Sequence, residues 1–327
     1  MTWLTRFRDN VYLHLVVPLV PSLPAWFAYG LAIGYADVRV RLDRTRLREV
    51  VLCLGQVLGP HLGEREKARV ARDYFRNRVC VKVDALRLAG SGKQLTRMVE
   101  VRGDRSLKDV LSQGKGAILC SGHFGSVRAC AGLLGALGFP VTLIANWTFA
   151  PEPGQVDSLR KAIIWKPIQH HLQRGNLLVA TERGTNIAVA MQAATILRQN
   201  EAIVTNIDTG ISEKDLRRAI TVEFLNGHTR VLPGPSDLAG FTGASMLTVF
   251  LYRREDWRHF VLEISPVSGN GAPAMQECMT RLESVIRAHP AQWEHWNMRK
   301  LVRLNLYPRE SAVNYYMTSY GRWYDWE

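Results

Sequence analysis

Apolar and polar positions divide the chain into an N-terminal part with helical periodicity and a later part of short apolar runs. Residues 45–62 and 64–86 place apolar side chains three and four positions apart, which is the spacing of one helix face. After residue 95, strands are expected at 98–101, 117–120, 140–145, 175–180 and 202–207, with helices at 107–113, from 126, at 155–173 and at 187–199. Strands that alternate with helices at these spacings predict an α/β sheet with crossover connections.

The remaining pattern adds strands and one long helix. Residues 220–224 and 229–232 flank Asn226-Gly227, a pair typical of a hairpin turn. Further strands are expected at 246–252 and 259–264, and a helix at 274–287 that ends near Pro290. The chain therefore divides into a helical N-terminal region (1–95), an α/β domain (96–310) and an aromatic C-terminal tail (311–327).

The segment from Val11 to Ala36 is apolar almost throughout and is about long enough to cross a bilayer. Pro18, Pro21 and Pro24 interrupt it, and proline breaks helices. A pair of short helices that enters the membrane or lies on its surface therefore fits better than a continuous span. The arginines on either side suit anionic head groups, while a buried helical hairpin of a soluble protein is the alternative.

The 327 residues carry a formal net charge of +13, with a pI of about 9.8. Such a surface favours an acidic carrier protein, the phosphates of coenzyme A or an anionic membrane. No zinc-finger, RNA-recognition or helix-turn-helix pattern accompanies the scattered basic residues, so nucleic acid is not an expected partner. Five cysteines without a CxxC pair indicate buried, reduced thiols and a cytoplasmic location.

His123 is the strongest candidate for chemistry. It follows the apolar run at 117–120 and precedes the helix expected from residue 126, a position where open α/β sheets place their active sites. Gly122 and Gly125 beside it would let a substrate approach the imidazole closely. A histidine can take a proton from an attacking hydroxyl or amine near neutral pH, so His123 is the expected general base.

Asp208 is the second candidate, because it follows the strand expected at 202–207 and precedes Thr209-Gly210. A carboxylate there could orient an imidazole, although Asp and Gly are also ordinary turn residues. The segment from Gln292 to Arg299, which holds two tryptophans, is interpreted mainly as a lock for the chain's end. No HExxH or phosphate-binding loop is present, so neither a metal nor a nucleotide is predicted.

Several motifs resemble, in their order and spacing, the late lipid A acyltransferases (lauroyl and myristoyl transferases) and the related phosphatidylinositol mannoside acyltransferases. These motifs are EREKARVARDYFRN, GHFGS, DTG, FLNGHTRVLPGPSDLAGFTGASMLTVFLYR and HPAQWEHWNMR, and the resemblance spans about residues 10–305. It implies the glycerolipid acyltransferase fold, a mixed central sheet flanked by helices, and acyl transfer from an acyl carrier protein or coenzyme A thioester. It implies no other cofactor.

The resemblance also assigns residues. It places His123 on the family's catalytic histidine, Asp208 on a later aspartate, and Trp296 and Arg299 on the closing motif. The family's usual partner acid, five positions after the histidine, is replaced here by Arg128. A carboxylate would hold the imidazole's tautomer and stabilise the imidazolium, whereas an arginine disfavours that cation. We expect Arg128 and Arg299 to contact anionic groups of a substrate, and backbone N–H groups between Gly122 and Ser126 to stabilise the oxyanion.

Three interpretations of Arg128 remain open. Asp208 or Glu182 supplies the missing acid; or the acceptor is an amine, which needs less help from a base; or the site is degenerate and binds acyl groups or a partner without turnover. The amine interpretation would suit amide formation in natural product biosynthesis, and the first also suits an envelope glycolipid O-acyltransferase. In each enzymatic case the protein is expected in the cytoplasm, peripheral at the inner face of the cell membrane.

Overall fold

Seven strands form one mixed sheet in the computed structural model, which describes residues 12–59, 62–90, 96–146, 177–180, 186–211 and 213–320. Its strand order is β1-β9-β8-β2-β5-β3-β4. The five strands from β8 to β4 run parallel, and β9 and β1 run the opposite way because β8 pairs antiparallel with β9. The predicted α/β class with a mixed central sheet is therefore confirmed.

The strands of this sheet are β1 (Val99–Arg102), β2 (Ala117–Ser121), β3 (Val141–Asn146), β4 (Leu177–Ala180), β5 (Ala202–Asn206), β8 (Ser245–Arg253) and β9 (Phe260–Pro266). A separate hairpin pairs β6 (Ile220–Phe224) with β7 (Gly227–Val231). The turn residues are Leu225 and Asn226, which both have positive φ, so the turn lies one position before the predicted Asn226-Gly227 pair. The predicted strands thus lie within a few residues of those in the structure.

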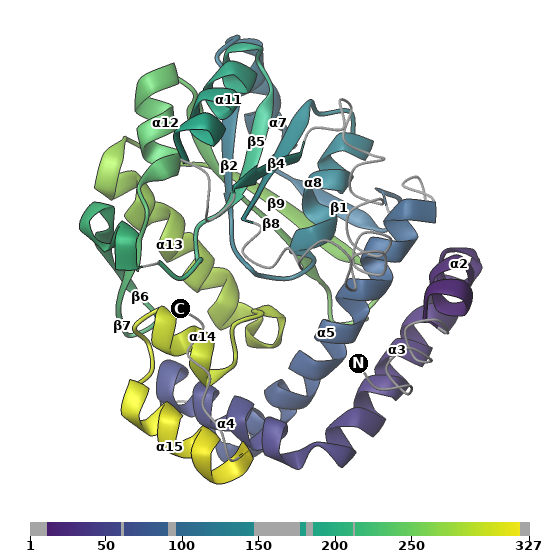
Figure 1. The fold of residues 1–327 in the computed structure, drawn as a ribbon. Coiled ribbons are helices and arrows are strands. Elements are labelled where there is room, and N and C mark those ends of the chain that lie inside the picture. The colour runs from purple at the N-terminus through teal and green to yellow at the C-terminus, as the bar shows by residue number, and fades with distance from the viewer. Residues whose placement is uncertain are drawn as a thin grey trace.

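Helices cover both faces of the sheet (Figure 1). The longer ones are α3 (Ala25–Leu42), α4 (Arg44–Leu58), α5 (Glu64–Gly90), α7 (Asp104–Ser112), α8 (Val127–Ala136), α11 (Asn186–Arg198), α12 (Gly234–Thr242), α13 (Gly271–Ala288), α14 (Met298–Arg303) and α15 (Arg309–Tyr320). The expected helix at 155–173 lies outside the described residues, and the boundaries of the three predicted regions stay predictions.

The helices α3 and α12 differ from the sequence expectations, and α14 and α15 were not predicted either. One 18-residue helix, α3, begins directly after Pro24, where two short helices were expected. This is possible because all three prolines precede it: Pro18 and Pro21 lie in the first turns of short helical segments, where a missing N–H costs nothing. Helix α12 was not predicted, since its sequence GPSDLAGFT is poor in strong helix formers. Among the described helices, none is long and apolar enough to cross a membrane.

The sheet separates two hydrophobic cores. Ile118 and Cys120 of β2 face the core shared with α4, α11 and α13, whereas Ala117 and Leu119 face the core shared with α3, α7 and α8. Helix α5 contributes to both cores and passes between the sheet and α3 (Figure 1). All five cysteines are buried and unpaired, which agrees with the prediction of buried thiols.

The C-terminal aromatic residues that the structure describes pack on the protein. The hydroxyl of Tyr315 donates to the carbonyl of Thr45, and that of Tyr316 donates to the buried Glu49 carboxylate. Tyr320 lies against both rings. Helix α15 therefore closes over α4, and the tail after Tyr320 lies outside the described residues.

A buried ion pair lies where α3, α5, α8 and β8 meet, behind the loop that follows β2. Asp84 of α5 is fully buried and accepts hydrogen bonds from Arg253 at the end of β8, from Tyr29 of α3 and from Ser126 at the start of α8. The Arg253 guanidinium also lies over the rings of Tyr29 and Phe260. Burial by itself favours a neutral guanidinium, but the charge of Asp84 holds the pKa of Arg253 above its ordinary value.

Replacing Asp84 tests how strongly this pair holds the fold. Asp84→Asn keeps the side chain's shape but leaves the Arg253 guanidinium, 2% exposed, without a counter-ion. Breaking a buried pair from one side costs about 3–5 kcal/mol, so we expect a loss of that size in urea unfolding. Asp104→Asn, which breaks the exposed pair with Lys108, is the control and should change stability little. Equal unfolding midpoints for the two variants would contradict the role of Asp84.

Candidate functional site

The carboxyl ends of β2 and β5 bring His123 and Asp208 together. The two strands pair in parallel with Ser121 opposite Asn206, and His123 and Asp208 each follow two residues later. β2 leads through the loop at 122–126 into α8, and β5 leads into the segment at 207–211. Neighbouring strand ends thus place a histidine and a carboxylate side by side.

Hydrogen bonds hold the two residues in a fixed arrangement. The Nδ1 atom of His123 lies 2.8 Å from Oδ1 of Asp208, and the backbone N–H of His123 donates to both carboxylate oxygens at 3.0 and 2.9 Å. Trp293 donates its indole N–H to Oδ2 at 2.9 Å. The carboxylate is fully buried while the His123 side chain is 27% exposed, so the pair presents its imidazole outward.

The donors around Asp208 keep it ionised. Burial alone would raise its pKa, but the neighbouring His123 ring and the hydrogen bonds from His123 and Trp293 lower the pKa well below its ordinary value. An ionised carboxylate only accepts hydrogen bonds, so it fixes the proton of His123 on Nδ1. In the neutral imidazole, the other ring nitrogen, Nε2, is then the one without a proton and is suited to accept a proton from a substrate.

His295 is a site residue that the sequence analysis missed. Its Nε2 lies 3.1 Å from the backbone carbonyl of Asp208, and its ring centroid lies 4.5 Å from that of His123. Burial is the largest influence on its pKa, which falls to about 3, so His295 is neutral at pH 7 and donates from Nε2. The only sequence signal was its place in the segment between two tryptophans, which was interpreted as structural.

The segment that contains His295 contributes to the site and also locks the end of the chain onto the protein. Trp293 and Trp296 are fully buried, and the N–H of Glu294 donates to the carbonyl of His123 at 2.7 Å. The Glu294 side chain pairs with Arg78 of α5 at 2.6 Å, and Tyr74 of the same helix donates to the Glu294 carbonyl. The segment is thus bound to α5 on one side and to the His123 loop on the other.

The small residues around His123 are required by packing. Gly125 has a φ of +59°, and a Cβ there would lie 2.1 Å from the carbonyl oxygen of Leu251. A Cβ on Gly122 would meet the Leu282 side chain at 2.6 Å. Ser126 donates its hydroxyl to Asp84. The positions of Gly122, Gly125 and Ser126 therefore have a structural cause, and their contact with substrate stays a prediction.

Three of the backbone N–H groups that were predicted to stabilise the oxyanion already donate hydrogen bonds within the protein. The N–H of His123 is held by Asp208, that of Gly125 donates to the carbonyl of Gln292, and that of Ser126 donates to the carbonyl of Leu251. A backbone N–H that already has a buried partner cannot also receive a developing oxyanion without losing that bond. These three groups of the loop are therefore unsuitable as oxyanion donors.

The other predicted residues lie as follows. Arg128 belongs to the first turn of α8, and its side chain is outside the described part of the structure. The guanidinium of Arg299 in α14 lies over the Tyr316 ring at 4.3 Å. Glu182 lies outside the described residues. Asp208 is therefore the one of the two suggested carboxylates whose contact with His123 can be assessed.

His123, Asp208 and His295 also form the one described group of side chains with the composition of a metal site, since their candidate ligand atoms lie within 4.8 Å of one another. Those atoms already serve the hydrogen bonds between Nδ1 of His123 and the carboxylate and between His295 and the Asp208 carbonyl. A hydrogen-bonded triad accounts for the cluster without a metal ion.

Comparison with known sequences connects this geometry to a family. Residues 11–302 match the sequence profile described as bacterial lipid A biosynthesis acyltransferase. No curated protein matches the chain. The match spans the N-terminal helices, the sheet, His123, Asp208 and the segment at 293–299.

Replacing His295 tests its neutral, buried state. Because its pKa is about 3 in the folded protein, the unfolded chain binds the extra proton between about pH 6.5 and pH 3, so stability falls as pH decreases through that range. The loss between pH 7 and pH 5 is about 2 kcal/mol for a folded-state pKa near 3. His295→Gln can keep the hydrogen bond to the Asp208 carbonyl without titrating, and should remove this loss.

Urea unfolding at pH 7 and pH 5 measures the effect. His259→Gln is the control, because His259 is an exposed histidine with its own aspartate partner, Asp256. A pH dependence that is unchanged in His295→Gln would show that His295 is not the titrating group.

Proposed function

Because the chain belongs to the bacterial lipid A biosynthesis acyltransferase family, we propose that it transfers an acyl group from a thioester to a hydroxyl or amine with His123 as the general base. As a member of this family, the chain is an acyltransferase of the lipid A type. The observation that carries the mechanism is the contact between His123 Nδ1 and the buried Asp208 carboxylate at 2.8 Å.

The proposed step uses both nitrogens of His123. Nε2 takes a proton from the acceptor's hydroxyl or amine group while the oxygen or nitrogen of that group attacks the thioester carbonyl carbon. The tetrahedral intermediate then collapses, the C–S bond breaks, and the imidazolium returns its proton to the leaving thiolate. Asp208 remains ionised throughout and stabilises the imidazolium, which is the role of a carboxylate partner in such a pair.

The contact with Asp208 gives His123 the carboxylate partner that Arg128 cannot provide, so His123 need not be a weak base. The replacement of the usual acid by Arg128 suggested either an amine acceptor or a degenerate site, since both demand less of the histidine. With a buried carboxylate on Nδ1, His123 is equipped to activate a hydroxyl, so the geometry favours the interpretation in which Asp208 supplies the missing acid. Amide formation in natural product biosynthesis remains an alternative that rests on Arg128 alone.

The proposed donor is an acyl carrier protein or coenzyme A thioester, because the net charge of +13 complements an acidic carrier protein or the phosphates of coenzyme A. We propose no further cofactor. The proposed location is the cytoplasm, peripheral at the inner face of the membrane. The exposed apolar side chains of α3 support this location, among them Trp26, Leu31 and Tyr35, which are 63%, 55% and 56% exposed.

The pair is tested by substitution. His123→Ala removes the base and Asp208→Asn keeps the shape but not the charge, so each should lower kcat about 10²–10⁴-fold, measured with acyl coenzyme A and acyl carrier protein donors. Asp256→Asn, in the exposed His259–Asp256 pair, is the matched control and should keep full activity. Full activity of His123→Ala would refute the mechanism, and loss only in His123→Ala would assign the acid's role to another group.

The acceptor is tested with an alcohol and an amine that share one carbon skeleton, supplied to the purified wild-type protein with the same acyl thioester. We expect ester to form, and mass spectrometry distinguishes ester from amide. Amide as the main product would favour the alternative of specialised metabolism. Acyl binding without transfer to either acceptor, from any donor, would instead indicate a degenerate acyl-binding protein.

A further inference from the structure

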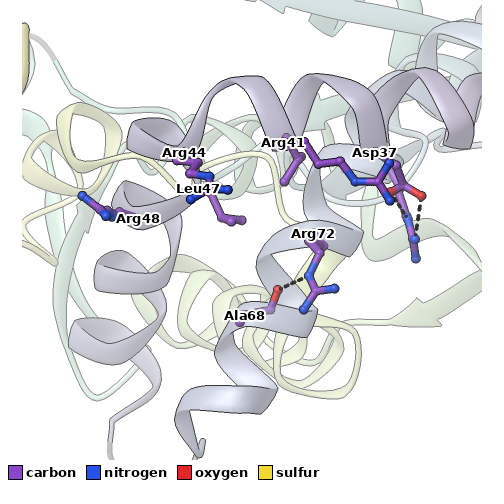
Figure 2. A pocket seen from close by; sticks show the side chains of 9 residues that line it. Asp37, Arg41, Arg44, Leu47, Arg48, Ala68 and Arg72 are labelled. Carbon is purple, nitrogen blue, oxygen red and sulfur yellow. Dashed lines mark hydrogen bonds and ion pairs between the residues drawn. The ribbon is translucent and has the colours of Figure 1, made fainter.

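A hollow of about 390 Å³ lies between α3, α4 and α5, apart from the catalytic pair. Five of its nine lining residues are arginines: Arg41 from α3, Arg44 and Arg48 from α4, and Arg72 and Arg76 from α5. Figure 2 shows Arg41, Arg44 and Arg48 around the corner where α3 meets α4, with Arg72 of α5 on the opposite side. Three helices thus contribute arginines to the lining of one small space.

The carboxylates near the hollow are already used. Asp37, which is the one acidic lining residue, pairs with Arg76 at 2.7 Å, and Asp73 pairs with the same guanidinium at 3.0 Å. Within the part of the chain that the structure describes, Arg41, Arg48 and Arg72 form no ion pair. The positive charges of these arginines affect Asp37. Its pKa is lowered first by the hydrogen bond from Arg76 and further by the charges of Arg41 and Arg72.

Unmatched arginines gathered in this way repel one another, and an anion in the hollow would relieve that repulsion. The planar guanidinium binds phosphate through two parallel hydrogen bonds, and arginines from three helices can approach one phosphate from several sides. The chemistry of the hollow is therefore that of a phosphate site.

The surface beside the hollow indicates which phosphate. Helix α3 carries exposed apolar side chains along its length, and the row ends at Val38 and Leu42, which are 53% and 82% exposed. Val38 lies three positions before Arg41, the spacing of neighbours on one helix face, so the apolar face reaches the edge of the hollow. A soluble acidic protein or a nucleotide would leave this face in water, whereas a phospholipid would cover both surfaces.

We propose that the hollow binds the phosphate of an anionic membrane phospholipid while the outer face of α3 lies against the lipid chains. The site rests on the proposed peripheral location and is independent of the acyl-transfer chemistry. Helix α5 separates the two: Tyr74 and Arg78 contact Glu294 beside His123, whereas Arg72 and Arg76 line the hollow. The bound lipid is thus a membrane anchor and not the acyl acceptor.

The test is flotation of the full-length protein with vesicles of phosphatidylcholine alone or mixed with phosphatidylglycerol. We expect binding to require phosphatidylglycerol. The triple variant Arg41→Gln, Arg48→Gln and Arg72→Gln removes one cation from each helix. It should weaken partition about 100-fold, because each arginine near an anionic surface contributes about 1 kcal/mol.

A control triple variant loses the same net charge elsewhere: Arg105→Gln, Arg230→Gln and Arg258→Gln change exposed arginines of α7, β7 and the loop before β9. It should bind vesicles almost as the wild type does. Both triple variants should retain acyl transfer between soluble substrates, so failure of the catalytic proposal is detected separately.

Three outcomes would overturn the site. If the two triple variants lose vesicle binding equally, the effect is one of net charge and not of the hollow. If the wild type binds both kinds of vesicle equally, the protein is peripheral at the membrane but has no phosphate site. Absence of binding to any vesicle would overturn the location together with the lipid site. Tight binding of glycerol 3-phosphate in solution, without vesicle binding, would identify a soluble phosphate as the occupant.

Discussion

The buried carboxylate of Asp208 is the constraint on which the catalytic centre depends. A fully buried anion is costly unless it is hydrogen-bonded, and Asp208 receives the N–H and ring of His123 and the indole of Trp293. These donors come from two segments, the loop after β2 and the segment at 293–295, so satisfying one carboxylate brings both segments to the end of β5. The same bonds that make Asp208 tolerable in the core also fix the tautomer and direction of the proposed base.

The loop that carries His123 is held from its other side by a second buried anion. Asp84 binds Ser126, three residues after His123, and its own charge is balanced by Arg253. Asp84 lies on α5, and so do Tyr74 and Arg78, which contact Glu294. One long helix therefore supports the loop and the segment that closes over it, and both sides of His123 are positioned by buried charge.

The sequence was enough to predict the fold class and the two residues of the pair, because strand ends, glycines and turn residues are local signals. His123 and Asp208 could not be shown to meet, since β3, β4 and α11 lie between them along the chain, whereas β2 and β5 are neighbours in the sheet. His295 gave no signal of its own. Its role comes from burial beside Asp208 and from its contact with the Asp208 carbonyl, and neither follows from spacing along the sequence.

The position of the acid changes what Arg128 means. An acid five residues after the histidine would share its helix opening and would depend on the local geometry of α8. Asp208 instead belongs to the neighbouring strand end and is fixed by donors from two further segments. With the acid's role met from β5, position 128 is not needed to hold the imidazole's tautomer, so an arginine there need not signify a failed site. The residue that separates the chain from the family pattern is thus compatible with an intact general base, and the chemistry of the acceptor becomes a question about the substrate rather than about a weakened histidine.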